Sequence, residues 1–214
     1  MKAAALFLFD RTAIMAQPWA NAGIDCYCVD SQNPKGEARD GNIVRVGADI
    51  NRWVPPLGAP IVFACAFTPC TDMAVSGARW FKGKGLYLLA DSIALFARSA
   101  ELIEATGAPG FIENPVSTLA TYWRKPDHIF QPWQFAHIDP AANYRKTTCL
   151  WTFGDFVMPQ GLEYPLPHLG EPDDRIHKAA PGPDRANFRS ATPPGFPRAV
   201  FDANHPACPE RIAA

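Results

Sequence analysis

A cysteine, a glutamate and a basic pair stand out as residues able to do covalent chemistry together. Cys70 comes shortly after the apolar run Ile61–Phe67, Glu113 ends a second apolar stretch, and Arg145 and Lys146 precede a third. A thiolate is a strong nucleophile, and a carboxylic acid can protonate the group under attack. A cation can stabilise an oxygen that gains charge. This set of residue types suits Michaelis-type addition to a pyrimidine ring.

Cys70 stands where open α/β sheets place their chemistry. The seven apolar residues of Ile61–Phe67 predict a fully buried parallel strand, which a Thr-Pro pair ends just before Cys70. Ligands of such sheets bind outside the carboxyl ends of the strands. Taken alone, Cys70 is more simply interpreted as a buried structural cysteine. The acids and cations predicted at neighbouring strand ends favour the nucleophile.

Alternating strands and helices must position these residues. The pattern predicts a mostly parallel, doubly wound α/β sheet. Because the carboxyl ends of parallel strands share one edge, we expect Asp30, Cys70 and Glu113 to face one crevice. Strands are expected at 3–9, 24–29, 43–46, 61–67, 110–112 and 148–151, and helices at 13–22, 89–103, 116–123 and 194–204.

Composition predicts one globular domain with an irregular end. The chain has 214 residues, of which 48% are hydrophobic and 19% charged, and its 22 prolines become denser from Pro159 onward. We expect a catalytic domain at 1–158, a proline-rich loop at 159–188 and a C-terminal helix at 189–214 that returns to the same domain. The residues between 31 and 41 are expected to form a polar loop.

Charge and cysteine usage narrow the class of protein. The net charge of −1 provides no global field that would recruit nucleic acid, so polynucleotide contacts must come from local patches. No stretch approaches the length of a membrane span, and the apolar N-terminus is too short for a signal peptide. The six cysteines form neither CxxC pairs nor a regular framework. Four of them lie in apolar, strand-like runs, which favours a reducing cytosol, bacterial or phage-infected. Zinc binding by Cys26, Cys28 and a histidine has the wrong spacing.

Asp30 suggests a nucleotide-type cofactor. It follows the second predicted strand, about 20 residues after the first, and an acid there can bond ribose hydroxyls. The glycine-rich turn that normally accompanies such an acid is missing, because Asp10-Arg11-Thr12-Ala13 occupies its place.

The order of these motifs resembles the cytosine-C5 methyltransferase family, and most closely its short, phage-type putative members. Phe9 and the following turn resemble the first cofactor motif, and Arg189 to Pro193 and Asn204 faintly resemble the last two. The similarity is strongest over residues 1–150. It rests on Asp30, Gly47-Ala48-Asp49-Ile50, Pro69-Cys70 with Ser76-Gly77-Ala78-Arg79, Glu113-Asn114-Pro115 and the segment 145–151.

The resemblance implies a Rossmann-like methyltransferase that moves a methyl group from S-adenosyl-L-methionine (AdoMet) to C5 of cytosine in DNA. Cys70 would add to C6, Glu113 would protonate N3, and Arg145, with Lys146 beside it, would support O2. Substrate binding falls to Ser76, Arg79 and Asn114, and no metal is implied. The residues assigned to cofactor binding are Phe9, Asp10, Asp30, Asp49, Ile50, Pro69 and Asn204.

One part of the family pattern is missing. The segment 152–188 is too short and too rich in proline for a target-recognition domain. A homodimer or a partner protein would have to supply that function. We expect little sequence specificity and a preference for single-stranded or opened cytosine, because base flipping costs a few kcal/mol.

Alternative functions remain open. The same chemistry suits free cytosine nucleotides or RNA, and Asn114-Pro115 partly fits an amino-methyltransferase motif. A catalytically inactive protein that binds AdoMet or nucleic acid is a hypothesis of a different class. In any of these cases an aromatic group could stack bases or form a structural cluster, namely Tyr122, Trp123, Phe130, Trp133 and Phe135.

Overall fold

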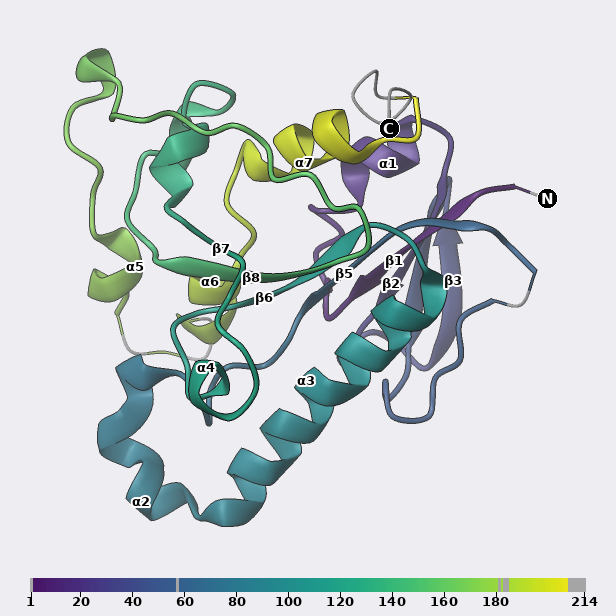
Figure 1. Cartoon of the computed structure of the whole chain (residues 1–214), viewed down its shortest axis with the longest axis horizontal. Helices are drawn as coiled ribbons and strands as arrows, with labels where there is room; N and C mark the ends of the chain where they lie inside the picture. The colour runs from purple at the N-terminus through teal and green to yellow at the C-terminus, as the bar shows by residue number, and fades with distance from the viewer. Residues whose placement is uncertain (1, 57, 181, 183–184, 208–214) are drawn as a thin grey trace.

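A computed structural model describes residues 2–56, 58–180, 182 and 185–207 (Figure 1). Its centre is an eight-stranded mixed sheet with the order β3-β4-β2-β1-β5-β6-β8-β7. The predicted α/β class with a mostly parallel sheet is confirmed. The strands are β1 Ala4–Leu8, β2 Asp25–Val29, β3 Gly36–Asp40, β4 Ile43–Gly47, β5 Ile61–Phe67, β6 Gly110–Asn114, β7 His128–Phe130 and β8 Thr148–Phe153.

The direction of the strands creates a switch point in the middle of the sheet. β4, β2, β1, β5 and β6 are parallel neighbours, whereas β3 pairs antiparallel with β4 at one edge. At the other edge β8 is antiparallel to β6, and β7 is antiparallel to β8. The chain moves outward from β1 to β2 and β4, then returns to β5 on the other side of β1. A ligand crevice is therefore expected outside the carboxyl ends of β1 and β5.

Helices cover both faces of the sheet (Figure 1). On one face α1 (Gln17–Asn21) and α7 (Phe196–Asn204) pack on the strands, and Trp19 stacks on Phe63. On the other face α3 (Leu86–Thr106) packs through Phe96 and Ile103. Gly107 ends α3 in a left-handed conformation, φ 64°, which places the end of this helix where the sequence predicts it.

Two local predictions were wrong. The expected helix 13–22 is reduced to α1, because Ala13 takes a left-handed φ of 58° that a helix cannot contain. The expected polar loop 31–41 contains β3, whose five residues are all exposed. A strand at the edge of a sheet with both faces in water carries no apolar pattern, so its sequence resembles a loop.

Short helices replace much of the expected proline-rich loop. The segment 159–188 contains a 3-10 turn at Pro167–Leu169, α5 (Arg175–Lys178) and the start of α6 (Arg185–Ser190). The predicted closing helix at 194–204 is confirmed as α7. The remaining helical turns are η1 Val75–Trp80, α2 Phe81–Lys84, α4 Leu119–Tyr122, η2 Pro132–Phe135 and η3 Pro140–Ala142. Within the described ranges no helix is long and apolar enough to cross a lipid bilayer.

Candidate functional site

A cavity of about 1600 Å³ lies at the switch point of the sheet. Asp30 and Asp49 line one part of it, and Cys70, Glu113 and Lys146 line another. The structure thus brings together residues that follow β1, β2, β4, β5 and β6, as the shared edge of a parallel sheet requires. Segments from α5 and α6 complete the wall on the C-terminal side.

Buried hydrogen bonds hold Cys70 at the end of β5. Asn114, at the end of β6, donates from Nδ2 to the Thr68 carbonyl oxygen at 3.1 Å and to Thr68 Oγ1 at 3.0 Å. The backbone N–H groups of Met73 and Ala74 both donate to the Cys70 carbonyl oxygen, at 3.2 and 2.9 Å. The chain therefore turns away directly after Cys70, and the thiol stays at the cavity wall.

Glu113 and Lys146 form a long, largely buried ion pair beside the thiol. Lys146 Nζ lies 3.8 Å from Glu113 Oε1, and both side chains are 11% exposed. Glu113 Oε1 is buried and accepts no hydrogen bond from a described residue. A buried acceptor without a partner is costly, so this oxygen is available for a ligand that donates a hydrogen bond.

The pKa of the Cys70 thiol is raised above its usual value. Burial is the largest cause, and the negative charge of Glu113 is the second, while Lys146 and Arg189 act in the opposite direction. At neutral pH the resting group is therefore a thiol rather than a thiolate. A nucleophile in this position needs a base to remove its proton, and Glu113 is the carboxylate beside it.

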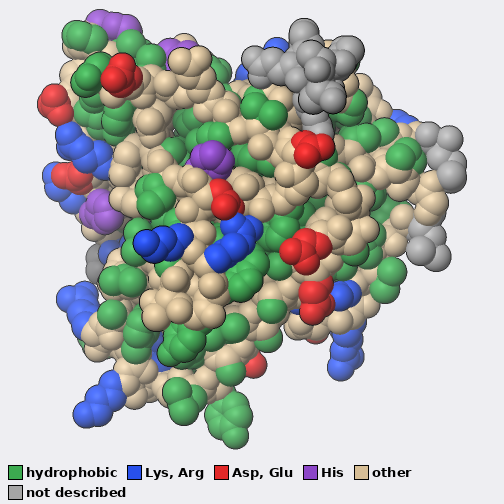
Figure 2. Space-filling view, viewed as in Figure 1, with side chains coloured by type: hydrophobic (Ala, Val, Ile, Leu, Met, Phe, Trp, Pro, Cys, Tyr) green, Lys and Arg blue, Asp and Glu red, His purple; other side chains and the backbone are tan. Residues whose placement is uncertain are grey.

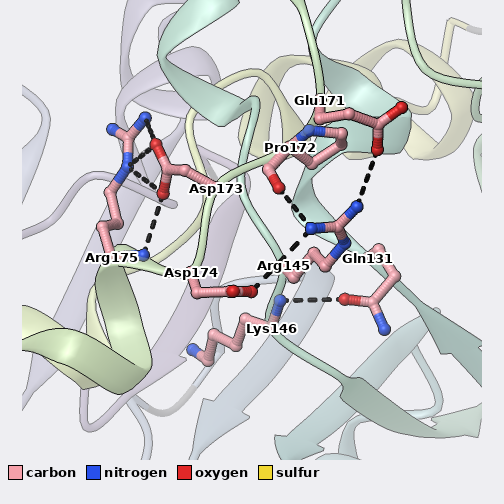
Figure 3. Close-up of polar contacts among 8 residues, drawn as sticks. All are labelled: Gln131, Arg145, Lys146, Glu171, Pro172, Asp173, Asp174 and Arg175. Atoms are coloured by element: carbon pink, nitrogen blue, oxygen red, sulfur yellow. Dashed lines mark hydrogen bonds and ion pairs between the residues drawn. The ribbon is translucent and has the colours of Figure 1, made fainter.

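Lys146 lines this cavity and Arg145 does not. The two side chains point in different directions, and that of Arg145 reaches Glu171 and Pro172 (Figure 3). Its guanidinium donates to the Pro172 carbonyl oxygen at 2.6 Å and to Glu171 at 2.9 Å. The backbone of Lys146 donates to Gln131 Oε1 at 2.8 Å, which fixes the orientation of this segment. Of these two cations, only Lys146 lines the cavity and acts electrostatically on the Cys70 thiol.

Asp30 and Ile50 build the other part of the cavity. Asp30 is buried at the end of β2, and its Oδ1 accepts the backbone N–H of Gln32 at 2.7 Å. Its second carboxylate oxygen makes no hydrogen bond to a described residue. Asp49 is exposed, and its Oδ1 accepts the backbone N–H of Asn51 at 3.0 Å. Ile50 is buried and lines the cavity. This part of the cavity therefore combines one buried carboxylate, Asp30, with the apolar side chain of Ile50.

The turn after β1 adopts a glycine-like geometry without glycine. Phe9 and Ala13 have φ values of 60° and 58°, and they are the non-glycine residues with positive φ in the described chain. Asp10 is buried, and its two oxygens accept Thr12 Oγ1 at 2.9 Å and the Met15 N–H at 3.2 Å. Burial raises the pKa of Asp10 despite these bonds. Asp10 therefore shapes the turn, and Phe9 borders the cavity.

The other predicted site residues divide into two groups. Pro69, Ser76 and Arg79 line the cavity. Asn114 supports the Cys70 turn from behind, and Asn204 binds the backbone of Val157 through both ends of its amide, at 2.9 and 2.8 Å. Neither amide lies among the residues that line the cavity.

Most of the aromatic group suggested for base stacking has a structural role. Phe130 and Phe135 are buried against Phe196 in the core, and Trp123 packs on Phe96. None of the five aromatic residues lines the cavity. Cys26 and Cys28 are likewise fully buried core residues.

Arg189 is the site residue whose role the sequence did not predict. It comes from α6, lines the cavity, and acts electrostatically on Cys70. It follows Cys70 by more than a hundred positions in a proline-rich segment without periodicity. The faint motif resemblance at Arg189 to Pro193 assigned it no role beside Cys70.

The chain matches no protein-family model, and no curated protein is significantly similar to it.

Proposed function

We propose that this protein transfers a methyl group from AdoMet to C5 of cytosine through a covalent bond between Cys70 and C6. The observation that supports this most strongly is the grouping of Cys70, Glu113 and Lys146 in the same cavity as Asp30. A nucleophile, a carboxyl group and a cation then face one side of the cavity, and an acid suited to ribose faces the other. The proposal includes a Rossmann-like methyltransferase fold.

The cofactor would lie at the ends of β1, β2 and β4. Asp30 fits it, because the second oxygen of this buried carboxylate accepts no hydrogen bond from the described residues and can bond the ribose hydroxyls. Ile50 and Phe9 would contact the adenine and the sugar. When bound, AdoMet supplies an electrophilic methyl group to the part of the cavity near Cys70.

Glu113 and Lys146 would manage the protons and charge of the reaction. Glu113 takes the proton of the Cys70 thiol, the sulfur forms a bond to C6 of cytosine, and Glu113 delivers the proton to N3. Lys146 supports the negative charge that develops at O2. After methylation, a water molecule takes the C5 proton as the C6–S bond breaks and the thiolate leaves. Glu113 then takes back the N3 proton and returns it to the sulfur, which restores the ring and the resting thiol. In this proposal Lys146 carries the role that the sequence divided between Lys146 and Arg145.

A basic and aromatic arm beside the cavity favours a polynucleotide substrate. The arm consists of η1, α2 and the first turn of α3, residues 75–90. It carries Arg79, Lys82 and Lys84 and has no acidic residue of its own, while Lys84 pairs with Asp72 outside it at 2.8 Å. Its Trp80 and Tyr87 are 61% and 89% exposed. Figure 2 shows basic side chains over α2 at the lower left, next to apolar side chains where α3 begins. Exposed rings and cations together suit the bases and phosphates of an open strand.

A trapping experiment tests the proposal directly. The protein is incubated with AdoMet and an oligonucleotide containing 5-fluorocytosine, in which elimination cannot occur because C5 has no hydrogen. We expect a covalent adduct on Cys70 by peptide mass spectrometry, no adduct in Cys70→Ala, and a retained adduct in Cys149→Ala, which changes a buried cysteine outside the cavity. An adduct on another cysteine would contradict the mechanism.

Substrate class is decided in a second assay. Radiolabelled AdoMet is offered with duplex DNA, single-stranded DNA, RNA and cytosine nucleotides, and AdoMet binding is measured by calorimetry in parallel. Asp30→Ala should weaken that binding. Binding without transfer to any substrate would favour the alternative, an inactive AdoMet-binding protein, and absence of binding would reject both.

A further inference from the structure

We propose that Arg189 binds the phosphate of the nucleotide whose base enters the site. The protein would then recognise phosphorylated cytidine, either as a mononucleotide or within a strand, in preference to the nucleoside. The choice of cytosine as the base rests on the proposed function, whereas the anion site rests on the residues around Cys70 alone.

Among the described residues, Arg189 has no hydrogen-bond or ion-pair partner for its side chain. Its Nε is buried and forms no hydrogen bond, and no carboxylate of the described residues lies within ion-pair distance of its guanidinium. Arg185, in the same helix and also at the cavity, is different because its Nε donates to the Ala179 carbonyl oxygen at 2.9 Å. The two arginines therefore provide a matched pair, one satisfied and one not.

The charges around Cys70 leave an excess of one positive charge. Glu113 and Lys146 neutralise each other, and the resting Cys70 is an uncharged thiol, so the charge of Arg189 has no counterpart in this group. The buried Nε of Arg189 is a donor without a partner, which is costly, and the cost is removed when an anion accepts its hydrogen bond. A guanidinium offers forked donors that match phosphate oxygens. The missing anion is thus supplied by the ligand.

The cavity has room for a nucleotide in this position. Its volume of about 1600 Å³ exceeds what one cofactor occupies, since small-molecule sites typically measure about 300–1,000 Å³. Arg189, Lys146 and Glu113 line the same cavity as Cys70, and all three act electrostatically on its thiol. A base placed between Cys70 and Glu113 would therefore carry its sugar phosphate along the wall formed by α6.

Protection of Cys70 from alkylation measures this site without requiring turnover. The rate of modification by iodoacetamide, followed on the Cys70 peptide, is titrated with deoxycytidine, dCMP and a trinucleotide that has a central cytosine. We expect the two phosphate-bearing ligands to protect at concentrations about tenfold or more below deoxycytidine, as a hydrogen-bonded charge pair implies. Arg189→Met should bring the protection by dCMP to that of deoxycytidine, and Arg189→Lys should retain part of the difference.

Arg185→Met is the matched control, and it should keep the preference for dCMP within about twofold. A second comparison separates phosphate binding from an effect on the thiol itself. Arg189→Met should change protection by dCMP more than it changes the alkylation rate of the ligand-free protein. Equal protection by deoxycytidine and dCMP in the parent protein, or an unchanged preference in Arg189→Met, would overturn the proposal. A change confined to the free thiol would overturn it too, because Arg189 would then serve the thiolate.

The outcomes separate this proposal from the proposed function. A phosphate preference that depends on Arg189, in a protein that never transfers a methyl group, supports the anion site and rejects the reaction. Methyl transfer without such a preference supports the reaction and rejects the anion site.

Discussion

Cys70 is a nucleophile candidate that the fold keeps protonated at rest. Burial and the adjacent Glu113 both raise the pKa of its thiol, and Lys146 opposes them only in part. A resting thiol is protected from oxidation and from unspecific alkylation, since the thiolate is the reactive form. The same carboxylate that suppresses the thiolate is positioned to accept its proton once a substrate is bound.

The pH dependence of Cys70 alkylation should therefore respond to both neighbours. Glu113→Gln removes a negative charge that disfavours the thiolate, so the pKa of Cys70 should fall and the alkylation profile should move to lower pH. Lys146→Met removes a positive charge and should move the profile to higher pH. The measurement is the rate of iodoacetamide modification of the Cys70 peptide between about pH 6 and pH 10, a range around the usual thiol pKa. A profile that Glu113→Gln leaves in place would show that burial alone sets the pKa.

The turn after β1 adopts left-handed backbone conformations without glycine. Phe9 and Ala13 hold left-handed conformations that glycine adopts without strain. The Asp10 carboxylate stabilises the turn by accepting two hydrogen bonds inside it. The hydrogen bonds to buried Asp10 thus stabilise a turn in which Phe9 and Ala13 are strained.

Ala13→Gly should consequently be nearly neutral for stability. Relief of the left-handed strain gains about 1–2 kcal/mol, while glycine costs about 0.5–1 kcal/mol in chain entropy and about 0.8 kcal/mol for the buried methyl group. We expect the free energy of unfolding in urea to stay within about 0.5 kcal/mol of the parent. Ala100→Gly, a buried position inside α3, has no strain to relieve and should lose about 1–2 kcal/mol.

The start of β6 is a second element that depends on backbone space. A Cβ at Gly110 would lie 1.9 Å from the Ala64 carbonyl oxygen on β5, a backbone atom that cannot move alone. Gly110→Ala should therefore lower the free energy of unfolding by about 1–3 kcal/mol or more, as overpacking does. Gly83→Ala is the control, because a Cβ there meets nothing within 4 Å and the residue lies in α2. It should be neutral or stabilising by up to about 1 kcal/mol.

At the scale of the whole molecule, the site is assembled from distant parts of the chain. The strand edge supplies Asp30, Cys70 and Glu113, and the C-terminal segment returns to add Arg189. Asn204 anchors this return by binding the Val157 backbone. The basic and aromatic arm at residues 75–90 borders the same cavity, so in the proposed function a nucleic-acid strand would approach from that side.

The size of the molecule leads to a prediction about selectivity, which holds if the proposed function does. Direct base readout in a duplex needs side chains delivered into the major groove, and flipping a paired base costs a few kcal/mol. In the described part of the chain after Trp151, the α-helices have four to nine residues. We expect faster methylation of single strands than of matched duplexes and little sequence specificity, measured by bisulfite sequencing of both templates. Methylation by the purified monomer restricted to one duplex motif of four or more base pairs would contradict this.

Local patterns in the sequence were sufficient for the parallel strands and for the residues at their ends. Ile61–Phe67 is apolar because β5 is buried on both faces, and the Thr-Pro pair after it had to end the strand. Once parallel strands were predicted, Asp30, Cys70 and Glu113 had to share an edge. Such inferences succeed because burial and backbone chemistry act over a few residues.

Only the tertiary structure decided which cation faces the thiol and what completes the wall. Arg145 and Lys146 are adjacent in sequence, and their division depends on the pairing of Arg145 with Glu171 and Pro172, residues of a distant segment. Arg189 reaches Cys70 through the same segment, and exposed β3 is a strand because β4 pairs with it. These outcomes depend on contacts between residues far apart in the chain, and neither composition nor periodicity encodes such contacts locally.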